Sequence, residues 1–76
     1  MVVTYTKHCE IRIKQRNLKK SYIEQTVLKP DKTIDSFGKR KLAQKKLFDK
    51  TLEVVFIQEN NDFIIITAYW LTEVKE

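Results

Sequence analysis

The spacing of apolar residues in the first third of the chain predicts two helices. In residues 5–16 an apolar residue recurs at every fourth position, as on one face of a helix: Tyr5, Cys9 and Ile13. Thr4 or Thr6 can cap the start of this helix, because a threonine hydroxyl accepts from a free amide of the first turn. Asn17 can end it in a left-handed turn.

A second helix is predicted over residues 19–29. Its expected buried face consists of four apolar residues, Tyr22, Ile23, Val27 and Leu28. Ser21 can act as its N-cap, and a start near Lys19 fits equally well. Pro30 ends it, because proline disfavours helical geometry in the residue before it. We expect Leu18, in the short connection, to fill the gap between the two helices.

From residue 32 onward the pattern changes to that of β-strands. Turn signals divide this part into four segments, residues 32–37, 40–48, 52–58 and 63–71. The alternation over 40–48 is imperfect, because its apolar residues fall on both faces: Leu42 and Phe48 on one, Ala43 and Leu47 on the other. A β-bulge would reconcile them. A helix is the competing interpretation of this segment, because Lys, Ala, Gln and Leu favour helices.

The last two segments alternate more regularly. The strand over 52–58 places one apolar set on each face: Leu52, Val54 and Phe56 on one, Val55 and Ile57 on the other. The strand over 63–71 is apolar on both faces, which is typical of a strand inside a sheet. Turns are expected at Gly38 and over residues 49–51 and 59–62.

Two helices followed by four strands predict an α+β fold. We expect one domain over residues 1–76, because a chain of this length has no room for a second. In this fold the two N-terminal helices pack on a four-stranded antiparallel sheet formed by residues 32–71, in the order ααββββ. The charged tail, Thr72 to Glu76, is expected to be frayed.

Composition supports a folded domain and adds a positive charge. The chain is 42% hydrophobic and 33% charged, which excludes intrinsic disorder because a disordered chain lacks apolar residues to bury. The net charge is +5 and the pI is about 9.4. Such a balance attracts polyanions, of which RNA is the commonest in a cell, although lysines that only maintain solubility would give the same total.

Cysteine usage and hydropathy bear on location. The single cysteine, Cys9, has no partner in this chain for a disulfide and is expected in the core. The N-terminus lacks the basic and then apolar pattern of a signal segment. The longest apolar run, Phe63–Leu71, is shorter than the roughly 20 residues that span a bilayer. We therefore expect a cytoplasmic protein that does not associate with membranes.

His8, Arg12 and Arg16 form the main candidate site. Their spacing of four residues places them on one side of the first helix, over about 12 Å at 1.5 Å per residue. Histidine transfers protons near neutral pH, and arginine binds phosphate oxygens through paired donors. The set therefore fits metal-independent cleavage of RNA. A solvated helix face with no function is the competing interpretation.

Thr67 and Tyr69 are a second candidate set. Thr67 interrupts the apolar run of the last strand, and Tyr69 shares its face because side chains alternate. Thr67 either faces a site or is an ordinary strand residue, since threonine favours strands. Trp70 falls on the opposite face, where we expect it in the core or in an interface.

A basic run over residues 39–46 is the third candidate. On a strand, Arg40 and Lys46 share one face, whereas Lys39, Lys41 and Lys45 lie on the other. Such a run can follow an RNA backbone. Lysines also protect an edge strand against aggregation, so both interpretations stand. The chain has no metal-ligand spacing and no glycine-rich phosphate loop, so we expect neither a metal nor a cofactor.

Two motifs at opposite ends of the chain carry a family resemblance. The first is His8-x3-Arg12-x3-Arg16 followed by Asn17-Leu18, and the second runs from Val54-Val55-Phe56 to Ile65-Ile66-Thr67-Ala68-Tyr69. Together with a second helix that ends at Lys29-Pro30, they resemble a small prokaryotic domain family of unknown function. That family is similar to the barnase–colicin–RelE-like group of RNase toxins, which includes RelE, ParE and BrnT relatives.

The resemblance implies a RelE-like fold and a metal-independent endoribonuclease, often the toxin of a toxin–antitoxin pair. It implies roles for residues at matching positions: catalysis for His8, Arg12, Arg16 and Thr67, and RNA binding for Arg40 or Lys46 and for Tyr69. The implied partners are RNA, an antitoxin protein and a second copy of the chain. ParE relatives act on gyrase instead, so a non-catalytic module that binds RNA or protein remains the alternative.

Overall fold

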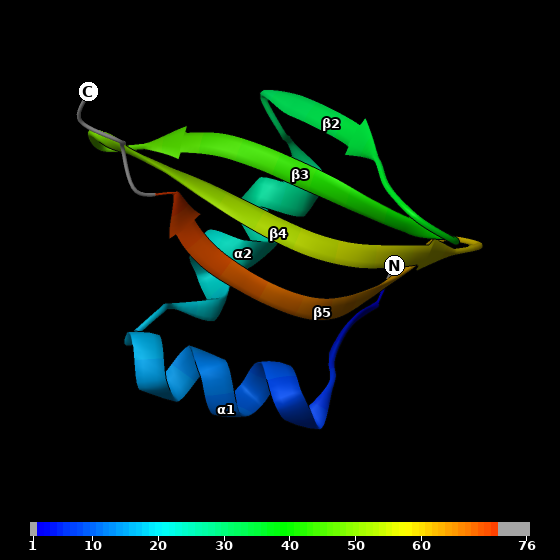
Figure 1. The fold of residues 1–76 in the computed structure, drawn as a ribbon, viewed down its shortest axis with the longest axis horizontal. Coiled ribbons are helices and arrows are strands. Elements are labelled where there is room, and N and C mark those ends of the chain that lie inside the picture. The colour runs from blue at the N-terminus through cyan, green and yellow to red at the C-terminus, as the bar shows by residue number, and fades with distance from the viewer. Residues whose placement is uncertain (1, 72–76) are drawn as a thin grey trace.

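The structure is a computed structural model that describes residues 2–71 and has one more strand than expected (Figure 1). Its elements are β1 (Val3–Tyr5), α1 (Lys7–Arg16), α2 (Lys20–Leu28), β2 (Lys32–Asp35), β3 (Arg40–Leu47), β4 (Lys50–Glu59) and β5 (Asp62–Leu71). The strands form one sheet in the order β1-β5-β4-β3-β2. The α+β class is therefore confirmed. The predicted tail, residues 72–76, lies outside the described residues.

The predicted four-stranded antiparallel sheet is wrong, because β1 adds a fifth strand in parallel with β5. Val3 to Tyr5 pair with Phe63 to Ile65, and all other strand pairs are antiparallel. Tyr5 was expected on the first helix but belongs to this strand. A segment of three residues is too short to show a strand alternation, and its partner lies about sixty positions away in the chain.

The first helix is otherwise as predicted. Thr6 is the N-cap, and its hydroxyl accepts from the Cys9 amide at 3.1 Å. Asn17 ends the helix with φ 56° and ψ 43°, in the left-handed region that asparagine tolerates. Cys9 and Ile13 are buried, as expected for the apolar stripe.

The second helix lies within its predicted bounds and begins after Lys19 rather than at a Ser21 cap. Ile23 and Val27 are buried as predicted, and Leu18, in the connection between the helices, is buried too. Leu28 was expected in the buried face but is 47% exposed. Thr26 is buried instead, because its hydroxyl donates to the Tyr22 carbonyl at 2.8 Å and is thereby satisfied within the helix.

Residues 40–47 form a strand, so the helical alternative for this segment is wrong. β3 pairs with β2 and β4 without a bulge. The irregularity lies in β5, where Ile66 is inserted between the pairs Val55–Thr67 and Phe56–Ile65. The turn after β3 consists of Phe48 and Asp49, whereas a turn over residues 49–51 was expected. β4 therefore begins at Lys50, two residues earlier than predicted.

The two faces of the sheet differ in what covers them. α2 packs on one face against β3 and β4, and α1 packs against β5 (Figure 1). The helix-covered face holds the buried strand residues Ala43, Leu52, Val54, Phe56, Phe63, Ile65 and Ala68. No helix or strand of residues 2–71 covers the other face, which we call the open face. Its central residues are Leu42, Gln44, Glu53, Val55, Thr67 and Tyr69.

Within residues 2–71, no helix is long and apolar enough to cross a membrane.

Candidate nucleic-acid interface

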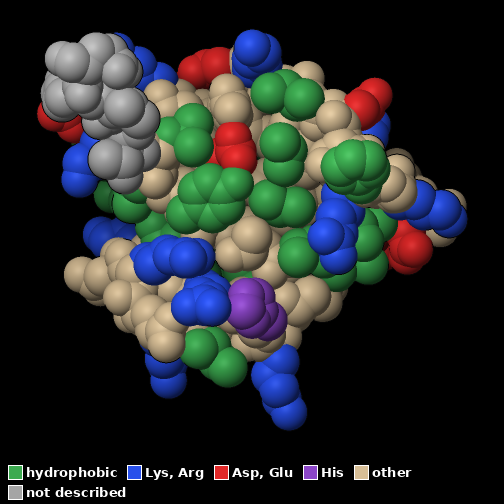
Figure 2. All heavy atoms as spheres, viewed as in Figure 1, with side chains coloured by type: hydrophobic (Ala, Val, Ile, Leu, Met, Phe, Trp, Pro, Cys, Tyr) green, Lys and Arg blue, Asp and Glu red, His purple; other side chains and the backbone are tan. Residues whose placement is uncertain are grey.

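α1 carries its basic stripe along the border of the open face. Figure 2 shows the histidine next to Lys and Arg side chains, between the helix and the apolar surface of the sheet. Arg12 Nε donates to His8 Nε2 over a long 3.4 Å, and Arg12 also donates to Gln15 Oε1 at 2.9 Å. The first of these contacts holds the positive charge of Arg12 beside His8 Nε2.

Arg16 connects the end of this stripe to β5. One of its terminal nitrogens donates to Thr67 Oγ1 at 3.4 Å and to the Ala68 carbonyl at 3.1 Å. Its guanidinium carbon lies 5.9 Å from the centre of the Tyr69 ring, within the range of a cation–π contact. The structure thus brings Arg16 together with Thr67 and Tyr69, although Arg16 precedes them by about fifty positions in the chain.

The same contacts have a structural consequence for the edge of β5. Beyond Ile65 this edge has no strand partner among the described residues, so its carbonyl groups need other donors. The Thr6 hydroxyl donates to the Ile66 carbonyl at 3.3 Å, and Arg16 donates to the next outward carbonyl, that of Ala68. Arg16 therefore helps to close the sheet edge, and within residues 2–71 its other guanidinium nitrogens donate to no further acceptor.

A hydrogen-bonded row crosses the middle of the open face. Gln44, Glu53 and Tyr69 lie side by side on β3, β4 and β5. The Tyr69 hydroxyl donates to Glu53 Oε2, and Gln44 Nε2 donates to Glu53 Oε1 at 2.6 Å. Glu53 is only 8% exposed, so these two donors compensate for the burial of its carboxylate. The row fixes the position of the Tyr69 ring beside Arg16.

Burial, followed by the hydrogen bond and the negative charge of Glu53, raises the pKa of Tyr69 to about 12, against the opposing charge of Arg16. Tyr69 therefore holds its proton at neutral pH and is unsuited to the role of general base.

Glu53 was not identified as a site residue from the sequence, because there it resembles any outward polar residue between Leu52 and Val54. The sequence did contain one indication of its burial. Strand alternation places Glu53 on the same sheet face as the apolar residues Val55 and Ile57, so this face is not fully solvated.

Alkaline pH should destabilise the protein partly through Tyr69. A tyrosine whose folded pKa lies above the unfolded value of 10 contributes stability below pH 10, and that contribution is lost as pH rises toward 12. We expect the free energy of unfolding, measured in urea between pH 9 and pH 11, to fall less steeply in Tyr69→Phe than in the wild type. Tyr5, whose pKa is also raised, is present in both proteins. Equal slopes would contradict the assignment.

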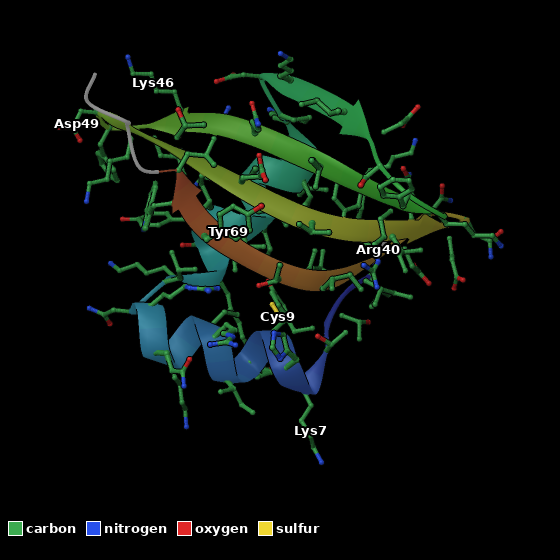
Figure 3. The ribbon with its side chains drawn as sticks, viewed as in Figure 1. Lys7, Cys9, Arg40, Lys46, Asp49 and Tyr69 are labelled. Atoms are coloured by element: carbon green, nitrogen blue, oxygen red, sulfur yellow. The ribbon has the colours of Figure 1, made fainter. Side chains whose placement is uncertain are left out.

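Arg40 and Lys46 lie on the open face but at its opposite ends (Figure 3). Six residues of extended chain separate them by roughly 20 Å. Their shared face is as predicted, and so is the placement of Lys41 and Lys45 on the other face. Lys45 donates to the Lys29 carbonyl at 3.0 Å, away from the open face. Arg40 and Lys46 therefore flank the candidate site rather than joining its centre.

Cys9 lies in the core, as expected, and Trp70 is partly buried against the core. Cys9 is fully buried between α1 and β5, and burial, followed by the charge of Glu10, raises the pKa of its thiol (Figure 3). Trp70 packs against the core and lies 6.2 Å from the Tyr22 ring. Within residues 2–71, no three His, Cys, Asp or Glu side chains are grouped closely enough to hold a metal ion.

Comparison with known families matches residues 5–70 to a domain of unknown function, DUF4258. No significant match to a curated protein or to a solved structure was found. The matched region begins in β1 and ends in β5, so it contains both helices, the open face and every candidate residue named above. The chain therefore belongs to the DUF4258 family.

Proposed function

We propose that this protein is a metal-independent endoribonuclease that binds RNA across the border between α1 and the open face. The observation that supports this most strongly is the meeting of the basic stripe with β5 at Arg16, 3.4 Å from Thr67. A proton-transfer group, two permanent cations and a hydroxyl thereby border one surface, on which His8 and Arg16 are exposed. The motifs that resemble those of RNase toxins consist of the same residues, and the comparisons link the chain only to DUF4258.

In the proposed reaction, His8 Nε2 takes the proton from a ribose 2′-hydroxyl. The 2′-oxygen attacks the adjacent phosphorus, the bond to the 5′-oxygen breaks, and a 2′,3′-cyclic phosphate remains. His8 is the only histidine in the chain, so its protonated ring also returns the proton to the departing 5′-oxygen. Arg12 and Arg16 stabilise the negative charge that develops on the phosphoryl oxygens.

The remaining candidate residues bind and orient the RNA. The Thr67 hydroxyl, already a partner of Arg16, donates to a phosphoryl oxygen. Tyr69 stays neutral and contacts a sugar or base with its ring, which the row with Glu53 holds in place. Arg40 and Lys46 attract the flanking phosphates through their charge.

As a finer proposal, the protein acts as the toxin of a toxin–antitoxin pair. Its expression should then arrest growth, and the product of a neighbouring gene should restore growth by binding it. Short edge strands such as β2, with four residues, offer backbone groups to that partner or to a second copy of the chain.

A cleavage assay tests the enzymatic proposal. Purified protein is incubated with total RNA and with ribosome-bound RNA in excess EDTA, and the fragment ends are identified. We expect cleavage that survives EDTA and leaves cyclic phosphate ends. Absence of cleavage on both substrates, or cleavage that requires a divalent metal, would reject the proposal.

One observation favours a non-catalytic binding module as the second candidate. Arg16 is already held by Thr67 and the Ala68 carbonyl, which suits a fixed binding surface as well as an active site. In that case RNA binds without cleavage, and the affinity falls steeply with salt.

We expect Arg12→Glu to abolish RNA binding, whereas Lys14→Glu, on the far side of α1, should reduce it only modestly. Equal effects of the two charge reversals would argue against a localised site.

A further inference from the structure

A second aromatic and basic surface lies at the end of the sheet that is next to the α1–α2 connection. The Tyr22 ring is 5.7 Å from Phe48 and 6.2 Å from Trp70, with interplanar angles of 72° and 67°. Lys19 Nζ lies 5.8 Å from the Tyr22 ring, and Lys50 Nζ lies 5.8 Å from the Trp70 ring. We call these five residues the Phe48 cluster; none of them belongs to the site described above.

Phe48 is the most unusual member of the cluster. Its side chain is 77% exposed, and its φ of 62° is a conformation that a bulky side chain adopts only with strain. Glycine or asparagine adopts this φ at lower free energy, as Gly38 does with φ 64° in the turn after β2. The fold therefore does not require an aromatic ring at this turn. The Phe48 ring is nevertheless present, exposed to solvent and in edge-on contact with the Tyr22 ring.

The cluster carries positive charge and adjoins the candidate site along the chain. Lys19 follows Arg16 by three positions, and Trp70 follows Tyr69 on the opposite face of β5. Among residues 2–71, neither Lys19 nor Lys50 makes an ion pair within 4.0 Å. The cluster therefore holds two ammonium groups beside its aromatic rings.

We propose that the Phe48 cluster binds unpaired bases of single-stranded RNA, with a base stacked on Phe48. This inference rests on the proposed function for its ligand. Aromatic rings beside unpaired cations are the usual platform for single strands, because every base has a face that can stack. A protein partner fits less well, because lysine is depleted in the buried centres of protein interfaces.

Binding of a non-cleavable oligonucleotide tests the inference. The probe is a fluorescent, 2′-O-methylated single strand of twelve nucleotides, and a duplex of the same length serves as comparison. We expect Phe48→Gly to weaken single-strand binding by about 5- to 140-fold, the range for losing one stacked base. Duplex binding should be unchanged, and Phe48→Trp should bind the single strand like the wild type.

Phe37→Gly is the matched control, because Phe37 is 92% exposed and lies at the other end of β3. The midpoint of urea unfolding of Phe48→Gly should stay close to that of the wild type, since glycine relieves the strain at φ 62°. Unfolding of Phe48→Gly would show that Phe48 is structural and would overturn the inference. The inference would also be overturned if Phe48→Gly bound the single strand as tightly as the wild type, or if Phe37→Gly lost as much affinity as Phe48→Gly. In the first of these cases, the cluster would instead serve as a contact for a protein.

The two proposals fail separately. If the wild type binds the probe in a manner that depends on Phe48 but cleaves no RNA, the nuclease is rejected and the cluster stands. If the wild type cleaves RNA and Phe48→Gly binds and cleaves equally well, only the cluster is rejected. If the wild type neither binds nor cleaves RNA, both are rejected.

Discussion

His8→Ala is expected to reduce the rate of RNA cleavage at least ~100-fold, the usual scale for losing a general acid–base group. The reason is that His8 is the chain's only histidine and Tyr69, with a pKa of about 12, cannot replace it at neutral pH. The measurement is the single-turnover rate on a defined RNA in EDTA, with the enzyme in excess. Affinity for a non-cleavable RNA should change little, because the arginines remain.

Lys7→Ala is the matched control for this experiment. Lys7 precedes His8 on α1, is exposed, and points away from the sheet (Figure 3). Its removal should leave the cleavage rate within a few-fold of the wild type. A rate in His8→Ala close to that of Lys7→Ala would exclude His8 from proton transfer, and another group would then have to move the proton.

Ile65→Ala is expected to lower the free energy of unfolding by about 2–5 kcal/mol, the range for removing a large side chain from a core. Ile65 is fully buried in β5, with Phe56 beside it on β4 and Tyr5 beside it on β1. A domain of this size is stable by only about 4–11 kcal/mol, so the loss is a large part of the total. Urea unfolding followed by circular dichroism measures it.

The neighbouring Ile64→Ala gives an internal comparison. Ile64 has the same side chain on the same strand but lies on the open face, where it is half-buried. We therefore expect it to cost clearly less than Ile65→Ala. Equal losses would mean that the open face is covered in solution, for example by a second copy of the chain.

The sequence predicted much of the candidate site but not its assembly. Four-residue spacing placed His8, Arg12 and Arg16 on one side of a helix, and alternation placed Thr67 and Tyr69 on one strand face. These are local consequences of helix and strand geometry. The contact between Arg16 and Thr67 is not local, because it depends on how α1 lies along β5. Glu53 was missed for the same reason: only its neighbours on β3 and β5 make it buried.

For the fold, the sequence by itself determined both helices, the left-handed stop at Asn17 and the alternation of β4, because each depends on residues close in the chain. Only the tertiary structure decided that Val3–Tyr5 is a strand, that it runs parallel to β5, and that the bulge lies at Ile66. A three-residue strand has too little pattern of its own, and it becomes a strand only because the edge of β5 supplies its hydrogen bonds. The open face exists for the same reason, since it is what remains after α2 covers one side of the sheet and α1 covers the edge of β5.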